Sequence, residues 1–251
     1  MLLLLTLTFA SPDQFQTESG YTMVQIPAGR FMMGAGAKKE NEHEVVLTHS
    51  FYMGVYEVEQ GFWGQFRDNN ASKFQDPKKP ISNVNFFDVV MFANSISKKE
   101  GLEECYEVTP QAASWPKGYS CDGYRLPTEA EWEYVALGDQ ESFSDLELDE
   151  YAWSKRNSQK TTHPVGSKKA NVYGVYDMLG NVWEWVWDIH GAYPSTEIID
   201  PTGAKKGPFR IRRGGGYSSG ASRVNPTKRY ALNPINEHSF LGFRLVRTVK
   251  K

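Results

Sequence analysis

The chain has 251 residues, a formal charge of −2 and a pI near 6.2. This balance argues against general binding to nucleic acid or to an anionic membrane, because both need a net basic face. Hydrophobic residues make up 40% of the chain and aromatic residues 14%, so a chain of this length can bury a substantial core. We find no linker-like stretch and no internal repeat, and therefore expect one domain.

The N-terminus begins with an apolar run. Residues 1–10 are too few to span a bilayer, and Thr8-Phe9-Ala10 is an acceptable signal-peptidase site. We interpret residues 1–10 as a signal peptide and residues 11–21 as an N-terminal extension before a single domain over residues 22–247. No other stretch approaches membrane length. The sequence therefore predicts a secreted or periplasmic protein without a membrane span.

Short strands are expected along the whole chain, because apolar and β-branched runs alternate with Gly- and Pro-rich turns. The predicted strands lie in residues 21–34 (two strands around the Pro27–Gly29 turn), 44–54, 183–187, 210–213 and 241–247.

Helices are fewer. Residues 58–66 carry aromatic side chains at helical spacing. Asn85 is an N-cap candidate for a helix ending near Gly101, and Thr128 with Glu131 forms a capping-box pattern. The acidic residues 139–150 predict a solvated loop. Short strands, two to three helices and much irregular chain indicate an α+β fold.

The chain has two cysteines, Cys105 and Cys121. A structural disulfide between them fits an oxidising compartment. Their spacing lacks the paired ligands of a zinc site.

The most informative stretch is residues 171–188. Trp183, Trp185 and Trp187 alternate, so on a strand they share one face. Asp177 and Glu184 flank a Gly-containing turn, and carboxylates with turn carbonyls are the oxygen ligands that calcium prefers. The alternative is that the carboxylates are solvated. The tryptophans are more simply read as core.

Several stretches in order resemble one family. The chain from about residue 22 to 247 resembles the formylglycine-generating-enzyme (sulfatase-modifying factor) domain, which implies a C-type-lectin-like α+β fold. The stretches that carry the resemblance are Met23-Val-Gln-Ile-Pro-Ala-Gly-Arg-Phe31, Tyr124-Arg-Leu-Pro-Thr-Glu-Ala-Glu-Trp-Glu-Tyr134, His163-Pro-Val-Gly166, residues 173–185, Arg213-Gly-Gly215 and Gly242-Phe-Arg244.

The resemblance also implies a structural calcium ion. By analogy the side chains of Asp177 and Glu184 and the carbonyls of Gly180 and Val182 would hold it. A second calcium site of the family's enzyme has no match that we can identify here.

The resemblance does not carry over the enzyme's copper site. That enzyme holds copper by two cysteine thiolates between the Gly-Gly motif and the closing Gly-Phe-Arg. Residues 216–241 contain no cysteine, and a serine hydroxyl cannot replace a thiolate for Cu(I). We therefore expect neither copper nor formylglycine chemistry.

A related iron-dependent branch uses three histidines, two of them close in sequence. The five histidines here are scattered and give no such triad.

These arguments favour a non-catalytic binding module with a protein or glycan ligand at the surface of the C-terminal loop. Aromatic residues with adaptable polar neighbours suit such recognition, although each residue singly could be ordinary surface. The candidate residues are Trp187, Asp188, His190, Tyr193, Tyr217, Ser218, Ser219, Arg223, Asn225, Arg229 and Asn233.

Two alternatives remain open. One is a metal-dependent oxidoreductase with an unrecognised site, for which Asp188 and His190 are the only close acid–histidine pair in this region. The other is a structural subunit of an envelope complex that docks through residues 139–150 or through its aromatic surface.

Overall fold

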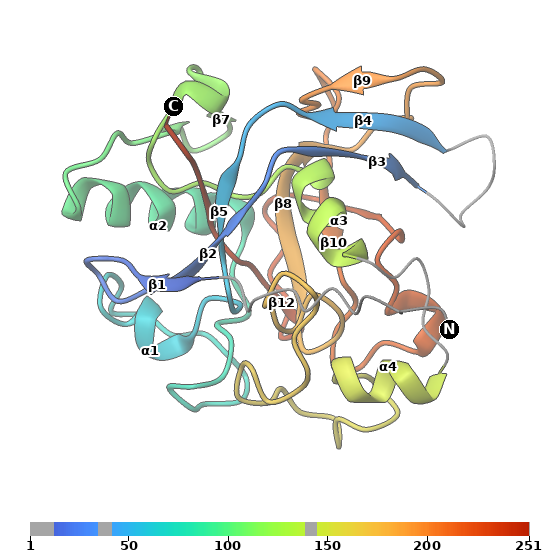
Figure 1. The fold of residues 1–251 in the computed structure, drawn as a ribbon. Helices are drawn as coiled ribbons and strands as arrows, with labels where there is room; N and C mark the ends of the chain where they lie inside the picture. The colour runs from blue at the N-terminus through green and yellow to red at the C-terminus, as the bar shows by residue number, and fades with distance from the viewer. Residues whose placement is uncertain (1–12, 35–41, 139–144, 251) are drawn as a thin grey trace, which may run out of the picture.

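The computed structural model describes residues 13–34, 42–138 and 145–250. The predicted signal peptide lies outside the described residues. The fold consists of short strands in several small sheets, with a few helices and much irregular chain between them (Figure 1). The predicted α+β class is confirmed.

One antiparallel sheet joins the two ends of the chain. Its order is β1 (Gln14–Gln16), β2 (Thr22–Ile26), β5 (Phe51–Gly54) and β13 (Val246–Thr248). Phe15 pairs with Met23, so residues 14–16 of the predicted N-terminal extension are part of this sheet.

The second sheet has the order β11 (Tyr230–Leu232), β10 (Arg210–Arg213), β8 (Trp183–Ile189) and β12 (Leu241–Gly242). β12 runs parallel to β8, and the other pairs are antiparallel. A third sheet holds β3 (Gly29–Met33), β4 (His43–Leu47) and β9 (Ile198–Ile199), and β6 (Glu107–Val108) pairs with β7 (Ala113–Ser114).

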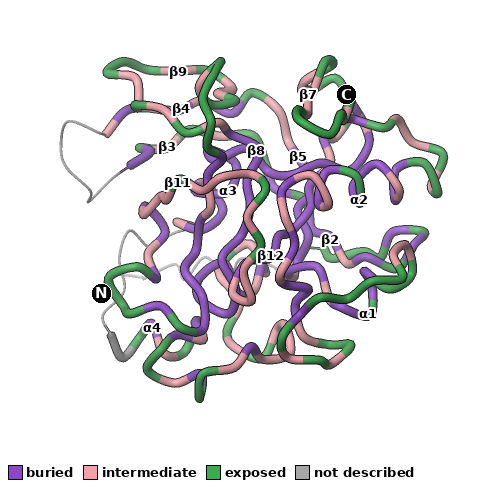
Figure 2. The backbone as a smooth tube through the Cα atoms, turned by 180° about the vertical axis from the view of Figure 1, so that it is seen from behind, coloured by how far each residue is buried: buried purple, intermediate pink, exposed green. Residues whose placement is uncertain are grey.

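β8 runs through the centre of the molecule, and all of its residues except Ile189 are buried (Figure 2). Trp183, Trp185 and Trp187 belong to one hydrophobic cluster. Val186 belongs to a second cluster together with Trp132 of α3 (Glu129–Leu137). The predicted strand and the core role of its tryptophans are confirmed.

Local capping signals fix the two main helices. The Asn85 side chain accepts a hydrogen bond from the Asp88 backbone N–H at the start of α2 (Phe86–Lys99), and Thr128 does the same with Glu131 in α3. Both are capping boxes, because the acidic side chain also accepts from the N-cap backbone. Both predicted helix starts are confirmed.

Other elements differ from their predictions. Residues 44–54 belong to two strands in different sheets, β4 and β5, with a bend at His49 between them. The Thr48 N–H in this connection donates to Asp200 Oδ1 at 2.8 Å. The closing strand is likewise divided into β12 and β13, and the helix in residues 58–66 is only α1 (Gln60–Trp63).

The prediction of a loop over residues 139–150 is wrong for its second half. Residues 145–151 form α4 (Asp145–Tyr151), and its Leu148 is buried. The first half, residues 139–144, lies outside the described residues.

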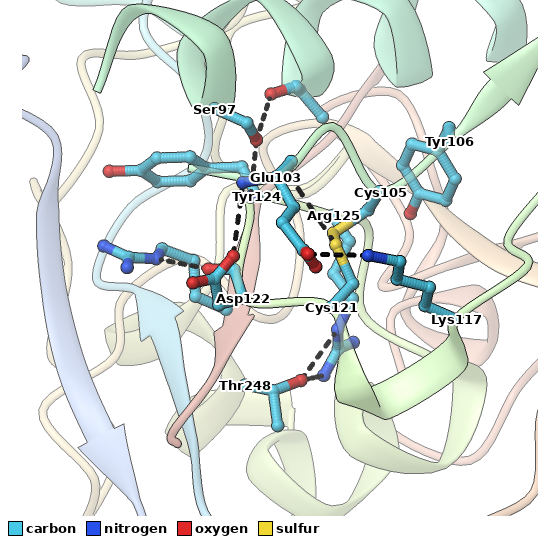
Figure 3. Close-up of a disulfide and its surroundings, with 12 residues drawn as sticks. Ser97, Glu103, Cys105, Tyr106, Lys117, Cys121, Asp122, Tyr124, Arg125 and Thr248 are labelled. Atoms are coloured by element: carbon cyan, nitrogen blue, oxygen red, sulfur yellow. Dashed lines mark hydrogen bonds and ion pairs between the residues drawn. A yellow bond between two sulfur atoms is a disulfide. The ribbon is translucent and has the colours of Figure 1, made fainter. Parts of the chain in front are cut away.

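The predicted disulfide between Cys105 and Cys121 is confirmed (Figure 3). The chain after it is anchored to α2 and to β13. The Tyr124 backbone N–H donates to Ser97 Oγ at 2.8 Å, and the Arg125 guanidinium donates to Thr248 Oγ1 at 3.1 Å. Within the described ranges, no helix is both long and apolar enough to cross a membrane.

Candidate functional site

The turn that leads into β8 is held in an unusual backbone conformation. Asp177 and Asn181 have positive φ angles of 53° and 47°. At Gly180 a Cβ atom would lie 2.4 Å from the Trp153 carbonyl oxygen, so only glycine fits there. The turn is thereby fixed against residue 153, and the Asn181 N–H donates to the same carbonyl at 2.8 Å.

Three buried carboxylates surround this turn: Glu57, Asp177 and Glu184. Arg244 is the buried cation among them, and its guanidinium donates to both oxygens of Glu184, with Nη2 at 2.7 Å from Oε1. When all four groups are ionised, this cluster carries two more negative than positive charges. Burial and the neighbouring carboxylates raise the pKa of Glu57 well above its usual range.

Asp177 is the carboxylate whose hydrogen bonding is incomplete. Its Oδ2 accepts from the Gly166 N–H at 2.7 Å, whereas its buried Oδ1 has no hydrogen-bond partner among the described residues. Burial raises the pKa of Asp177 to about 6. A buried, unpaired carboxylate oxygen in a cluster with excess negative charge suits a divalent cation.

Glu184 fits the predicted ligand set less simply. Its two oxygens already accept from Arg244 and, at 2.8 Å, from Trp132 Nε1. The described residues hold no group of three or more His, Cys, Asp and Glu side chains arranged for a metal ion. A calcium ion at this turn would therefore depend on Asp177 and on backbone carbonyls. Glu184 would have to contact the ion while it also accepts from Arg244.

A cavity of about 270 Å³ lies where the end of β8 meets the start of α3. Its lining includes Met33, His43, Glu129, Asp188, Tyr193 and Arg229. Three of the predicted ligand residues, Asp188, Tyr193 and Arg229, are thus brought together in one concave place.

The polar wall of the cavity is an ion-pair network centred on Glu129. Its Oε2 lies 2.7 Å from Arg229 Nη2, and its Oε1 lies 2.7 Å from Arg213 Nη1. Arg213 also contacts Glu133, and Arg229 lies over the Tyr193 ring at 4.1 Å. The network fixes the C-terminal part of the chain onto α3.

Asp188 occupies the floor of this region. Its Oδ2 accepts from the Glu129 N–H at 2.7 Å, which satisfies a free backbone donor at the start of α3. Burial, together with the charge of Glu129, raises the pKa of Asp188 to about 8. The surroundings of Asp188 therefore favour its protonated form.

The other predicted ligand residues lie elsewhere. His190 is exposed next to the cavity, and the pKa of its ring is lowered by burial and by Arg229. Trp187 is buried and stacks on Tyr106 at a centroid distance of 4.9 Å.

The remaining residues belong to the segment between β10 and β12, residues 214–240, which we call the C-terminal loop. Ser218 and Arg223 are exposed, whereas Tyr217 and Ser219 are buried. Asn225 Oδ1 accepts from the Thr227 N–H and Asn233 Oδ1 accepts from the Ile235 N–H, so both side chains shape turns. The predicted residues thus lie in the cavity wall, in the C-terminal loop or, for Trp187, in the hydrophobic core.

Sequence reasoning missed Glu129, His43 and Met33 in the cavity wall. The capping-box pattern placed Glu129 at a helix start, but no local pattern links it to Arg229, which is 100 residues away. An acidic residue in the first turn of a buried helix is the only signal that could have directed attention to it.

Comparison with known proteins agrees with this architecture. The family profile described as "Sulfatase-modifying factor enzyme 1-like domain" matches residues 8–249. "Chaperone protein LppX" of Paenibacillus barcinonensis is 31% identical over 90% of this chain and 89% of its own length. The formylglycine-generating enzyme of Bos taurus is 27% identical over 88% of this chain and 73% of its own length.

Among solved structures, "Treponema denticola variable protein 1" superposes with a TM-score of 0.86 at 31% identity. The match covers 96% of this chain and all of that one.

Proposed function

We propose that this chain, which belongs to the sulfatase-modifying factor family, is a non-catalytic extracytoplasmic binding module. It would hold its ligand at the surface of the C-terminal loop. The observation that carries the proposal is the fate of the cysteines. The chain has two, and both form the Cys105–Cys121 disulfide. No thiolate is left to bind copper as the family's enzyme requires.

The same disulfide supports the extracytoplasmic location. Disulfides persist in secreted and periplasmic proteins and are rare in reducing compartments. The bond joins two buried sulfur atoms within the hydrophobic core, which suits a structural rather than a redox role.

The ligand is proposed to be a protein in preference to a glycan. One relative, which aligns over 90% of this chain, is named a chaperone protein, and chaperones bind other proteins. The C-terminal loop offers Ser218 and Arg223 as exposed polar groups, and Ile235 is a large apolar side chain with 65% exposure. Exposed apolar and adaptable polar side chains on turns suit a protein interface.

A calcium ion at the turn before β8 is proposed to stabilise this scaffold. Asp177 and the carbonyls of Gly180 and Val182 would hold it, with Glu184 shared between the ion and Arg244. The unpaired Oδ1 of Asp177 and the excess negative charge around it support the assignment. An ion bound only by the folded state would stabilise it by mass action.

Affinity capture from the extracytoplasmic fraction of the source cells tests the binding role. The wild-type chain is compared with a loop variant, Arg223→Ala with Ile235→Ala, and with a control variant, Arg30→Ala with Met32→Ala. All four side chains are exposed, and the control pair lies on β3. We expect one protein to be retained by the wild type and the control and lost by the loop variant. Equal retention by all three would contradict a ligand site on the loop.

A further inference from the structure

Arg212 of β10 has a guanidinium group for which the described residues supply no hydrogen-bond acceptor and no ion pair. Its Nε and Nη1 atoms are buried and make no hydrogen bond, and no carboxylate within residues 13–34, 42–138 and 145–250 forms an ion pair with it. A buried N–H that lacks a partner costs free energy, and the cost is larger for a charged group. Such a group in a folded protein needs an explanation by a missing acceptor.

Aromatic rings hold this guanidinium in place. It lies over the Trp183 ring at 4.7 Å, over Phe240 at 5.4 Å and over Tyr230 at 6.0 Å. Tyr230 is also the cross-strand partner of Arg212 in β11. Stacking supplies attraction to the faces of the cation but leaves the N–H donors of Nε and Nη1 unused, because they point outward in the plane of the group.

The surroundings of Arg212 are positive. Arg223 lies over the same Tyr230 ring at 6.0 Å. Burial and, after it, the charge of Arg223 lower the pKa of Arg212. His238 stacks on Phe240, and its pKa is lowered by burial and by Arg212. Both guanidinium groups lie over Tyr230, and neither forms an ion pair with a carboxylate of the described residues. Their like charges therefore repel, and an anion would relieve the repulsion.

We propose that Arg212 and Arg223 form an oxyanion-binding subsite at the edge of the C-terminal loop, which takes a carboxylate, sulfate or phosphate group of the ligand. The guanidinium fork suits planar and tetrahedral oxyanions alike, and charge-assisted hydrogen bonds are stronger than neutral ones. Because Arg212 is stacked on three rings before the anion arrives, little side-chain entropy is lost on binding. The inference rests on the proposed function, since it names the chemistry that the loop surface would recognise.

The test is an anion titration that needs no knowledge of the natural ligand. Sodium sulfate and sodium acetate are added separately to the full chain at constant ionic strength, and the side-chain Nε–Hε signal of Arg212 is followed by NMR. Arg30 serves as the internal control, because it is exposed and already paired with Glu44 at 3.1 Å. We expect the Arg212 signal to shift to saturation with at least one anion and the Arg30 signal to shift little.

Variants separate the subsite from general electrostatics. Arg223→Met is expected to weaken the apparent affinity for the anion about tenfold, and Arg212→Met to abolish saturation at the backbone amides of residues 230 and 240. Arg30→Met removes the same charge and should leave the titration unchanged. A wild-type Arg212 signal that does not saturate with either anion would overturn the subsite, as would equal losses in Arg223→Met and Arg30→Met.

The two anions distinguish the source of the group. Stronger binding of sulfate assigns a sulfated or phosphorylated ligand, and stronger binding of acetate assigns a carboxylate. Failure of both titrations with loop-dependent capture intact would overturn the subsite alone, whereas loss of loop-dependent capture would overturn the proposed function.

Discussion

Arg212 and Arg213 are neighbours on β10, yet their guanidinium groups have opposite surroundings. Successive side chains of a strand point to opposite faces. Arg213 is fully buried against α3 and contacts Glu129 and Glu133. Arg212 lies over the Trp183 ring and has no carboxylate partner among the described residues. One arginine therefore holds the scaffold together, whereas its neighbour keeps Nε and Nη1 without an acceptor among the described residues.

This contrast predicts different effects on stability. Arg213→Met should lower the free energy of unfolding by about 3–5 kcal/mol, because it leaves the buried Glu133 without its cation and removes one of the two arginines paired with Glu129. Arg212→Met should change it by less than about 1 kcal/mol, because no hydrogen bond is lost and apolar contact with Trp183 is kept. Urea unfolding of the two variants measures both values. Equal destabilisation would contradict the assigned roles.

Calcium should stabilise the chain more at neutral than at acidic pH. The pKa of Asp177 is raised to about 6, so below that pH protons occupy the carboxylate and compete with the ion. We expect the melting temperature in calcium to exceed that in chelator at pH 7.5, and the difference to shrink at pH 5.

Asp177→Ala should remove this calcium effect. Asp68→Ala is the matched control, because Asp68 is exposed on a loop. The calcium assignment fails if chelator leaves the wild-type melting temperature unchanged at pH 7.5.

Asp188 should make the stability of the chain fall as the pH rises. Its pKa is raised from 3.8 to about 8, so the folded state binds the proton more tightly than the unfolded state does, and stability is lost as the pH rises between these values. Asp188→Asn keeps an oxygen that can accept from the Glu129 N–H but cannot ionise. We expect the variant to match the wild type near pH 4 and to melt higher at pH 9; the opposite order at pH 9 would rule out a raised pKa.

Removal of the disulfide should cost stability without changing the fold. The bond closes a loop with a sequence separation of 16, for which the chain-entropy estimate is about 3 kcal/mol. The double variant Cys105→Ser, Cys121→Ser should unfold at correspondingly lower urea concentration, and wild type kept in reductant should resemble it. Unaltered unfolding in both cases would mean that the bond contributes little.

The parts of the fold that sequence reasoning predicted are those set by local chemistry. Asn85 and Thr128 mark helix starts because their side chains bond to backbone groups three residues away. The break between β4 and β5 could not be predicted in this way, since the connection bonds to Asp200, which is 152 residues from Thr48.

The candidate site shows the same division. The turn with Asp177 and Gly180 lies within one short stretch, residues 171–188, so the sequence alone points to it. The cavity wall could not be predicted, because Glu129 is separated from Arg213 by 84 residues and from Arg229 by 100 residues along the chain. The lack of an acceptor for Arg212 also depends on which distant residues the fold places near it, and no local sequence pattern indicates that.

The central claim is that this family member binds a ligand and does not oxidise one. Elemental analysis of full-length protein purified without a metal-binding tag tests it most directly. The account predicts about one calcium per chain and only traces of copper and iron. One copper or one iron per chain would contradict it and would place a redox centre in a protein whose cysteines are both in a disulfide.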